Sequence, residues 1–233
     1  MIIASANFTL LALVDISFRV VEPVFFSTPI PLGGLGLDPP MIGTIMSLTG
    51  ILNGVFTVFL FARMTDWFGV KWLYLTGMIA AVPCFVLFPV INYLARNSVE
   101  HTGGLGPEVW IAVGVQVIMT VLLCMGYGAS SSKLNHPRTC PPHPSVPGAI
   151  FIFIAAAAPN KASLGATNGI AQLSVAIVRA VGPALASSMY SLSIDKEHHY
   201  MNGGLVYYVT TALSLCAVWM GSLLPKHPWK DRN

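Results

Sequence analysis

Three charged residues lie close together in the first apolar stretch of the chain, and they are the strongest candidates for chemistry. Asp15, Arg19 and Glu22 are spaced i, i+4 and i+7, so a helix would carry all three on one face. Charged groups at membrane depth are costly unless they face a bundle interior or a water-filled cavity. Pro23 removes one helical hydrogen bond beside them and favours a kink. The stripe predicts either a gated substrate or ion pathway, or a salt bridge that fixes helix packing.

A second polar stripe follows in a later apolar stretch. Asn168, Gln172 and Arg179 are spaced i, i+4 and i+11, close to one helical face. Arg179 is expected either to bind an anionic group of a substrate or to pair with Asp15 or Glu22 across the bundle, because an unpaired buried charge is costly. These residues extend the predicted pathway to a second helix.

Single amides in two other apolar stretches are weaker candidates for the same pathway. Asn53 and Gln116 each stand alone among apolar residues, a pattern that is also typical of hydrogen bonds between helices. His136, Cys140 and His143 have the residue types of metal ligands but lack a second ligand pair at zinc-site spacing, so no metal site is predicted. The sequence contains no nucleophile elbow or phosphate loop, which argues against an enzyme and against a bound cofactor.

The composition identifies the elements that must position these residues. Only 9% of the 233 residues are charged, 55% are hydrophobic, and the mean hydropathy is +0.71. A bilayer core takes about 20 helical residues to cross, and helices satisfy the backbone within lipid. The prediction is an all-α, polytopic membrane helix bundle, one domain over 1–233, with lipid as its main solvent. Its six apolar stretches lie near 3–27, 41–62, 70–94, 108–158 (interrupted), 165–193 and 203–224.

Positive charges between these stretches predict the orientation. Short cytoplasmic loops are enriched in Lys and Arg. Arg63, Lys71 and Lys161 fall on one side together with the basic tail, whereas Arg96 and Lys196 on the other side lie among acidic residues. Both termini are therefore expected on the cytoplasmic side of a multi-pass protein.

The fourth apolar stretch is interrupted by a segment that does not suit a membrane. Residues 129–148 are polar and contain five prolines, which exclude a helix. Only about ten apolar residues follow, too few to cross a bilayer. Deletion of 129–148 would join the two apolar pieces into one helix, so we interpret the segment as foreign to the fold, for example a retained intron.

Several motifs resemble one family. The loop at 62–71 is similar to the cytoplasmic loop motif of the major facilitator superfamily, with Asp66, Gly69 and Lys71 at its gating positions, although Ala62 and Val70 replace a Gly and an Arg. Segments 160–172, 179–183 and 203–208 resemble fungal members of the proton-antiporter type, including those similar to zinc-induced facilitators. The chain thus resembles the C-terminal half, helices seven to twelve, of a fungal transporter of this superfamily.

The resemblance implies a mechanism and a partner. Such proteins move a small molecule or ion by alternating access between two six-helix halves, here coupled to a proton, in the plasma membrane or the vacuole. One half cannot enclose a two-sided cavity, so a missing N-terminal half or a second copy is expected, and the chain reads as an incomplete gene product. The alternative is a non-transporting membrane fragment that associates with or regulates a related transporter.

Overall fold

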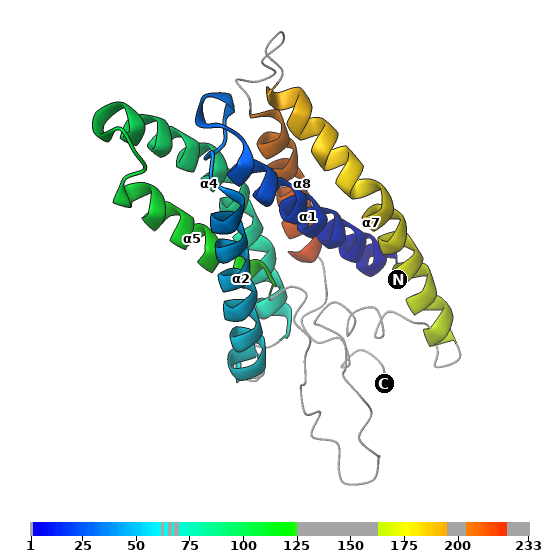
Figure 1. The fold of residues 1–233 in the computed structure, drawn as a ribbon. Helices are drawn as coiled ribbons and strands as arrows, with labels where there is room; N and C mark the ends of the chain where they lie inside the picture. Colours follow the sequence, from blue (N-terminus) through cyan, green and yellow to red (C-terminus); the bar gives the residue numbers. More distant parts are fainter. Residues whose placement is uncertain are drawn as a thin grey trace.

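The computed structural model describes residues 2–61, 63–64, 67, 70–124, 163–194 and 204–222. Over these ranges the chain is helical and contains no strand, which confirms the predicted all-α class. In Figure 1, α1 and α8 occupy the centre, α7 runs along one side, and α2 and α5 lie on the other. The helices in chain order are α1 (Ile2–Ser27), η1 (Ile30–Leu32), α2 (Pro39–Phe56), η2 (Thr57–Phe61), α4 (Val70–Thr102), α5 (Pro107–Cys124), α7 (Leu164–Ile194) and α8 (Leu205–Ser222).

The lengths and surfaces of these helices suit a bilayer. Large apolar side chains point outward, including Val58, Ile111 and Leu173, which are 71%, 68% and 63% exposed. The first predicted span, near 3–27, is α1, a continuous helix of 26 residues that carries the charged stripe. The chain is built as a multi-pass membrane protein. Five segments of the described chain are long and apolar enough to cross a membrane: Pro39–Leu60, Trp72–His101, Pro107–Cys124, Leu164–Ile194 and Leu205–Ser222.

The connection between α1 and α2 is a compact turn. Gly33 and Gly36 adopt positive φ angles of 103° and 65°, which glycine tolerates and other residues rarely adopt. Asn92 of α4 donates hydrogen bonds from Nδ2 to the carbonyl oxygens of Ile30 and Gly34, at 3.1 Å and 2.7 Å. These two bonds fix the connection to α4 before the chain re-enters as α2.

Helix α4 extends further than its apolar stretch predicted. We expected this span to end near 94, but the helix continues to Thr102. The extra turns carry polar side chains, and the Ser98 hydroxyl accepts a hydrogen bond from the Gly106 amide at 2.6 Å and donates one to the Gly104 carbonyl at 2.9 Å. Hydropathy therefore located the end of the apolar stretch but not the end of the helix.

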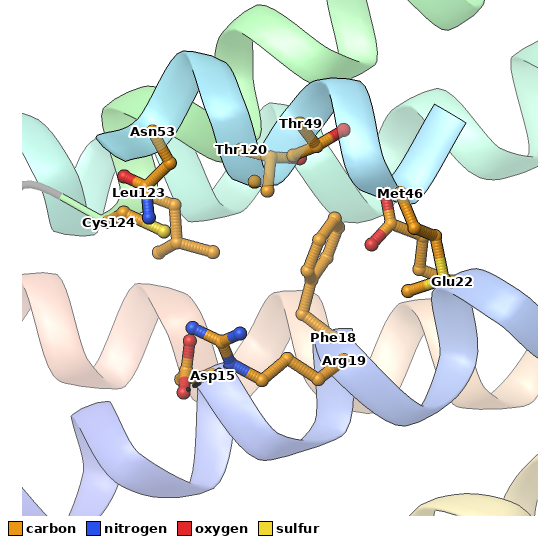
Figure 2. Close-up of a pocket in the computed structure, with 11 residues that line it drawn as sticks. Asp15, Phe18, Arg19, Glu22, Met46, Thr49, Asn53, Thr120, Leu123 and Cys124 are labelled. Atoms are coloured by element: carbon orange, nitrogen blue, oxygen red, sulfur yellow. Dashed lines mark hydrogen bonds and ion pairs between the residues drawn. The ribbon is translucent and has the colours of Figure 1, made fainter. Parts of the chain in front are cut away.

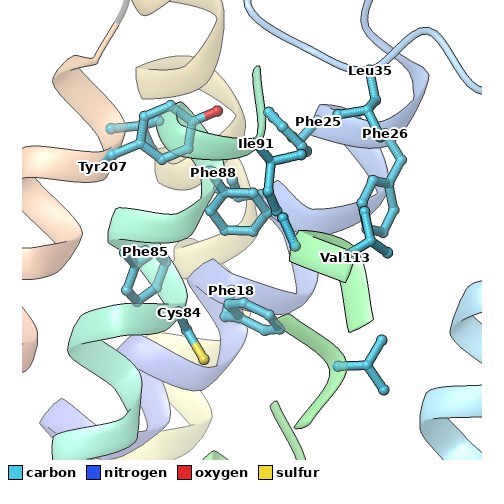
Figure 3. Packing of buried hydrophobic residues seen from close by; sticks show 14 of the residues in the cluster. Phe18, Phe25, Phe26, Leu35, Cys84, Phe85, Phe88, Ile91, Val113 and Tyr207 are labelled. Carbon is cyan, nitrogen blue, oxygen red and sulfur yellow. The ribbon is translucent and has the colours of Figure 1, made fainter. Parts of the chain in front are cut away.

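Aromatic side chains form the interior between α1, α4 and α8. Figure 3 shows Phe18 and Phe25 of α1 meeting Phe88 of α4, with ring centroids 5.7 Å and 4.9 Å apart. Phe88 also stacks on Tyr207 of α8 at 5.4 Å. Lipid is as apolar as these rings, so close packing rather than exclusion of water holds the helices together.

Close helix contact occurs at glycines other than those with GxxxG spacing. A Cβ added at Gly182 of α7 would lie 2.7 Å from Ile16 Cγ2 of α1, and one at Gly221 of α8 would lie 3.2 Å from Tyr74 Cε1 of α4. These two positions let neighbouring helices approach, whereas the glycines with GxxxG spacing make no close helix contact in the described part of the chain. The glycines with this spacing are Gly50 and Gly54, and Gly165 and Gly169. A Cβ added at any of these four would meet no atom of the described residues within 4 Å.

Candidate ligand-binding cavity

A cavity of about 120 Å³ lies where α1, α2 and α5 converge. Figure 2 shows polar side chains of α1 on one wall and those of α2 on the opposite wall. None of its lining residues comes from α4 or α8. The lining consists of Asp15, Phe18, Arg19, Glu22, Met46, Thr49, Gly50, Asn53, Thr120, Leu123 and Cys124.

The charged stripe of α1 forms one wall. Arg19 Nε donates to Asp15 Oδ2 at 2.9 Å, and the side chains are 58% and 11% exposed respectively. Glu22 is only 5% exposed, and its Oε1 atom has no hydrogen-bond partner within the described ranges. The i, i+4, i+7 spacing thus brings all three side chains to one cavity and leaves one buried carboxyl oxygen unsatisfied.

Polar side chains of α2 and α5 complete the cavity. Asn53 Oδ1 is buried without a hydrogen-bond partner. Thr49 Oγ1 donates to the Ile45 carbonyl at 2.9 Å, and Thr120 Oγ1 donates to the Gln116 carbonyl at 2.9 Å. Both hydroxyl hydrogens are therefore used within their own helices.

Gln116 lies next to the cavity but does not line it. Its side chain is fully buried, and Nε2 donates to the Cys84 carbonyl of α4 at 3.0 Å. This contact is the hydrogen bond between helices that a single amide in an apolar span also suggested. Its Oε1 atom has no partner among the described residues.

The second predicted stripe, on α7, lies away from this cavity. Asn168, Gln172 and Arg179 are all exposed and none of them lines it. Within the described ranges the one ion pair is that of Asp15 with Arg19, so the expected pairing of Arg179 with Asp15 or Glu22 is not found. The reason is the rotation of α7, which packs through its small residues on α1 and turns the polar stripe outward.

Several lining residues were not anticipated because their types are common in apolar helices. Phe18, Leu123 and Cys124 carry no chemical signal in the sequence. Met46 and Thr49 precede Asn53 by seven and four residues, so the rule that found the α1 stripe would have placed them on its face.

Other predicted features fall outside the described residues. Asp66 and Gly69 of the gating loop belong to this group, as do the side chain of Lys71 and the whole of 129–148 with its histidines and cysteine. Among the residues that are described, no group of three or more His, Cys, Asp or Glu side chains could hold a metal ion.

Comparison with known proteins identifies fungal membrane transporters as relatives. A major facilitator superfamily multidrug transporter of Aspergillus fumigatus is 23% identical over 227 residues, covering 93% of this chain and 33% of the relative. The efflux pump azaK of Aspergillus niger is 24% identical over 92% of this chain and 41% of the pump. A major facilitator-type transporter of Psilocybe cyanescens is 24% identical over 91% of this chain and 37% of its own length.

The chain thus spans between about a third and two fifths of the length of these relatives. No protein-family profile matches it. No solved structure matches it either.

Proposed function

We propose that the chain forms one half of a secondary transporter of the major facilitator type, which moves a small solute across a membrane by alternating access and couples that movement to protons. The similarity to fungal transporters over more than nine tenths of the chain supports this reading. Within the superfamily's architecture this part corresponds to the C-terminal six-helix half.

The observation that carries the proposal is the buried Glu22 carboxyl group. A buried carboxyl oxygen that lacks a hydrogen-bond partner among the described residues is costly in an apolar interior, so we infer that it binds something. Glu22 faces a cavity between helices, where it can take up and release a proton or meet a solute. The neighbouring Asp15–Arg19 pair would hold the guanidinium group beside Asp15, away from Glu22, while this exchange takes place.

A partner would complete the cavity. Its α2 wall belongs to the least buried candidate span, of which 6% lies inside the bundle. Exposed polar residues on α7, with Arg179 among them, suit a water-filled path between two halves better than a lipid contact. We propose either a separate N-terminal half or a second copy of this chain as the missing wall, with both termini and the 62–71 gating loop on the cytoplasmic side of the plasma or vacuolar membrane.

Transport in vesicles tests this proposal. The chain would be reconstituted alone and together with the N-terminal half of a related transporter, and solute-driven proton movement would be recorded with a trapped pH dye under an imposed pH gradient. We expect proton release with at least one solute, and its loss in Asp15→Asn and Arg179→Ala. A chain that binds the N-terminal half but moves no solute or proton would instead be a non-transporting fragment that associates with or regulates a transporter.

A further inference from the structure

We infer that the cavity between α1, α2 and α5 binds the head of a small organic cation that carries N–H donors, a primary or secondary ammonium group, with Glu22 as its counter-charge. The inference rests on the proposed transport function, because it names the class of solute. It stands on the charge, the hydrogen-bonding capacity and the apolar wall of this cavity.

The charge of the lining is negative. When Glu22 is ionised, Asp15 and Glu22 contribute two carboxylates and Arg19 one guanidinium group, which leaves one negative charge. Figure 2 shows the Arg19 guanidinium group turned toward Asp15, to which it donates a hydrogen bond, and the Glu22 carboxyl group at the other end of the cavity. An anionic solute would be repelled from the Glu22 end, whereas a monocation would neutralise it.

Two buried hydrogen-bond acceptors of the lining have no partner among the described residues. They are Glu22 Oε1 and Asn53 Oδ1. The hydroxyl hydrogens of Thr49 and Thr120 are both committed to carbonyl groups of their own helices. A ligand that satisfies these two acceptors must supply donors, which an ammonium group does and a quaternary ammonium group does not.

The remaining wall favours an organic cation over a metal ion. Phe18, Met46 and Leu123 give the cavity an apolar side. In Figure 2 the Phe18 ring lies beside the Glu22 carboxyl group, where a ring face can attract an ammonium ion and pack against its carbon chain. A hard metal ion would need several carboxylates and water, and the described residues offer no such cluster.

Binding to the full chain in lipid nanodiscs tests the inference. Calorimetry would compare three amine probes, namely butylammonium, 2-phenylethylammonium and its N-methyl derivative, with trimethyl(2-phenylethyl)ammonium, 2-phenylethanol and 3-phenylpropanoate. We expect the amines to bind above the level of empty nanodiscs and the quaternary analogue at least about tenfold more weakly. Glu22→Gln should weaken amine binding at least about tenfold, and Asn53→Leu several-fold, whereas Glu100→Gln, at an exposed position on α4, should leave it unchanged.

Two results would overturn the inference. One is that every amine behaves as it does with empty nanodiscs. The other is amine binding that Glu22→Gln leaves intact, or that the anionic probe matches. Glu22-dependent amine binding without any flux in vesicles would refute the transport proposal and leave this inference in place. Proton-coupled flux of an anionic or neutral solute that survives Glu22→Gln would refute this inference and leave the transport proposal in place.

Discussion

Asn92 on α4 and Glu22 on α1 are both buried polar residues on apolar helices, 8% and 5% exposed, yet they differ in their hydrogen bonds. Asn92 Nδ2 reaches two carbonyl groups of the α1–α2 connection and holds that turn in place. Glu22 Oε1 reaches none among the described residues. The fold accounts for the first residue, whereas we assign the second to the proposed binding of a proton or ligand.

In a membrane protein, the hydrogen bonds of a buried polar group help to distinguish a structural role from a functional one. Burying a polar group in an apolar medium costs free energy unless a hydrogen bond compensates it, and lipid offers no water to do so. A satisfied amide such as Asn92 therefore stabilises the bundle. An unsatisfied carboxyl group such as Glu22 destabilises it until a proton or ligand arrives. Substitutions at the two residues should accordingly have opposite signatures.

The largest effect is expected from Glu22→Gln, on function rather than on stability. Loss of the carboxyl group should reduce proton-coupled flux about a hundredfold, equivalent to about 2.7 kcal/mol. The free energy of unfolding should stay the same or rise, because Oε1 has no hydrogen bond to lose. Vesicle flux and denaturant titration in detergent would measure the two quantities, with Glu100→Gln as the control. A variant that unfolds more easily would show that Glu22 belongs to the architecture.

Asn92→Leu should show the reverse pattern. Removing its amide leaves the carbonyl groups of Ile30 and Gly34 without their donor, so the free energy of unfolding should fall by about 2 kcal/mol. Amine binding at Glu22 should be retained. The matched control is Asn97→Leu at an exposed position of the same helix, which should change stability little. An equal loss in both variants would mean that the α1–α2 turn does not depend on Asn92.

Gly182→Ala separates packing from hydrogen bonding. The added methyl group would meet Ile16 Cγ2 at 2.7 Å and push α7 away from α1, at a cost of about 1 kcal/mol in stability. On the same helix Gly169→Ala meets nothing within 4 Å and should stabilise slightly through helix propensity. Thermal unfolding of both variants in detergent would show whether their effects indeed have opposite signs.

The smallest effect is expected at the Asp15–Arg19 pair. Like Asn92 it is hydrogen-bonded, but its Arg19 side chain is exposed to the surroundings. A double-mutant cycle with Asp15→Asn and Arg19→Gln should give a coupling energy of about 0.5 kcal/mol, because the Arg19 side chain is 58% exposed. Salt should weaken that coupling if the cavity contains water. A coupling well above about 1 kcal/mol would place the pair inside a dry bundle.

Much of this architecture could be predicted from the sequence. The apolar stretches located the helices within a few residues, because lipid imposes a minimum length on each span. The start of α2 also has a local signal, because Pro39 and Pro40 occupy its first helical positions, which proline favours. The end of α4 was missed because hydrogen bonds of Ser98, rather than hydropathy, set it.

The candidate site was only partly predictable, since local spacing and helix rotation carry different information. The i, i+4, i+7 pattern alone places Asp15, Arg19 and Glu22 on one face, because helical periodicity is a property of the chain itself. Which helix that face meets depends on how α1, α2 and α5 rotate and pack, and no single segment encodes this rotation. Only the tertiary structure turned Arg179 away from the cavity and left Glu22 Oε1 without a partner, because both outcomes arise from contacts between distant parts of the chain.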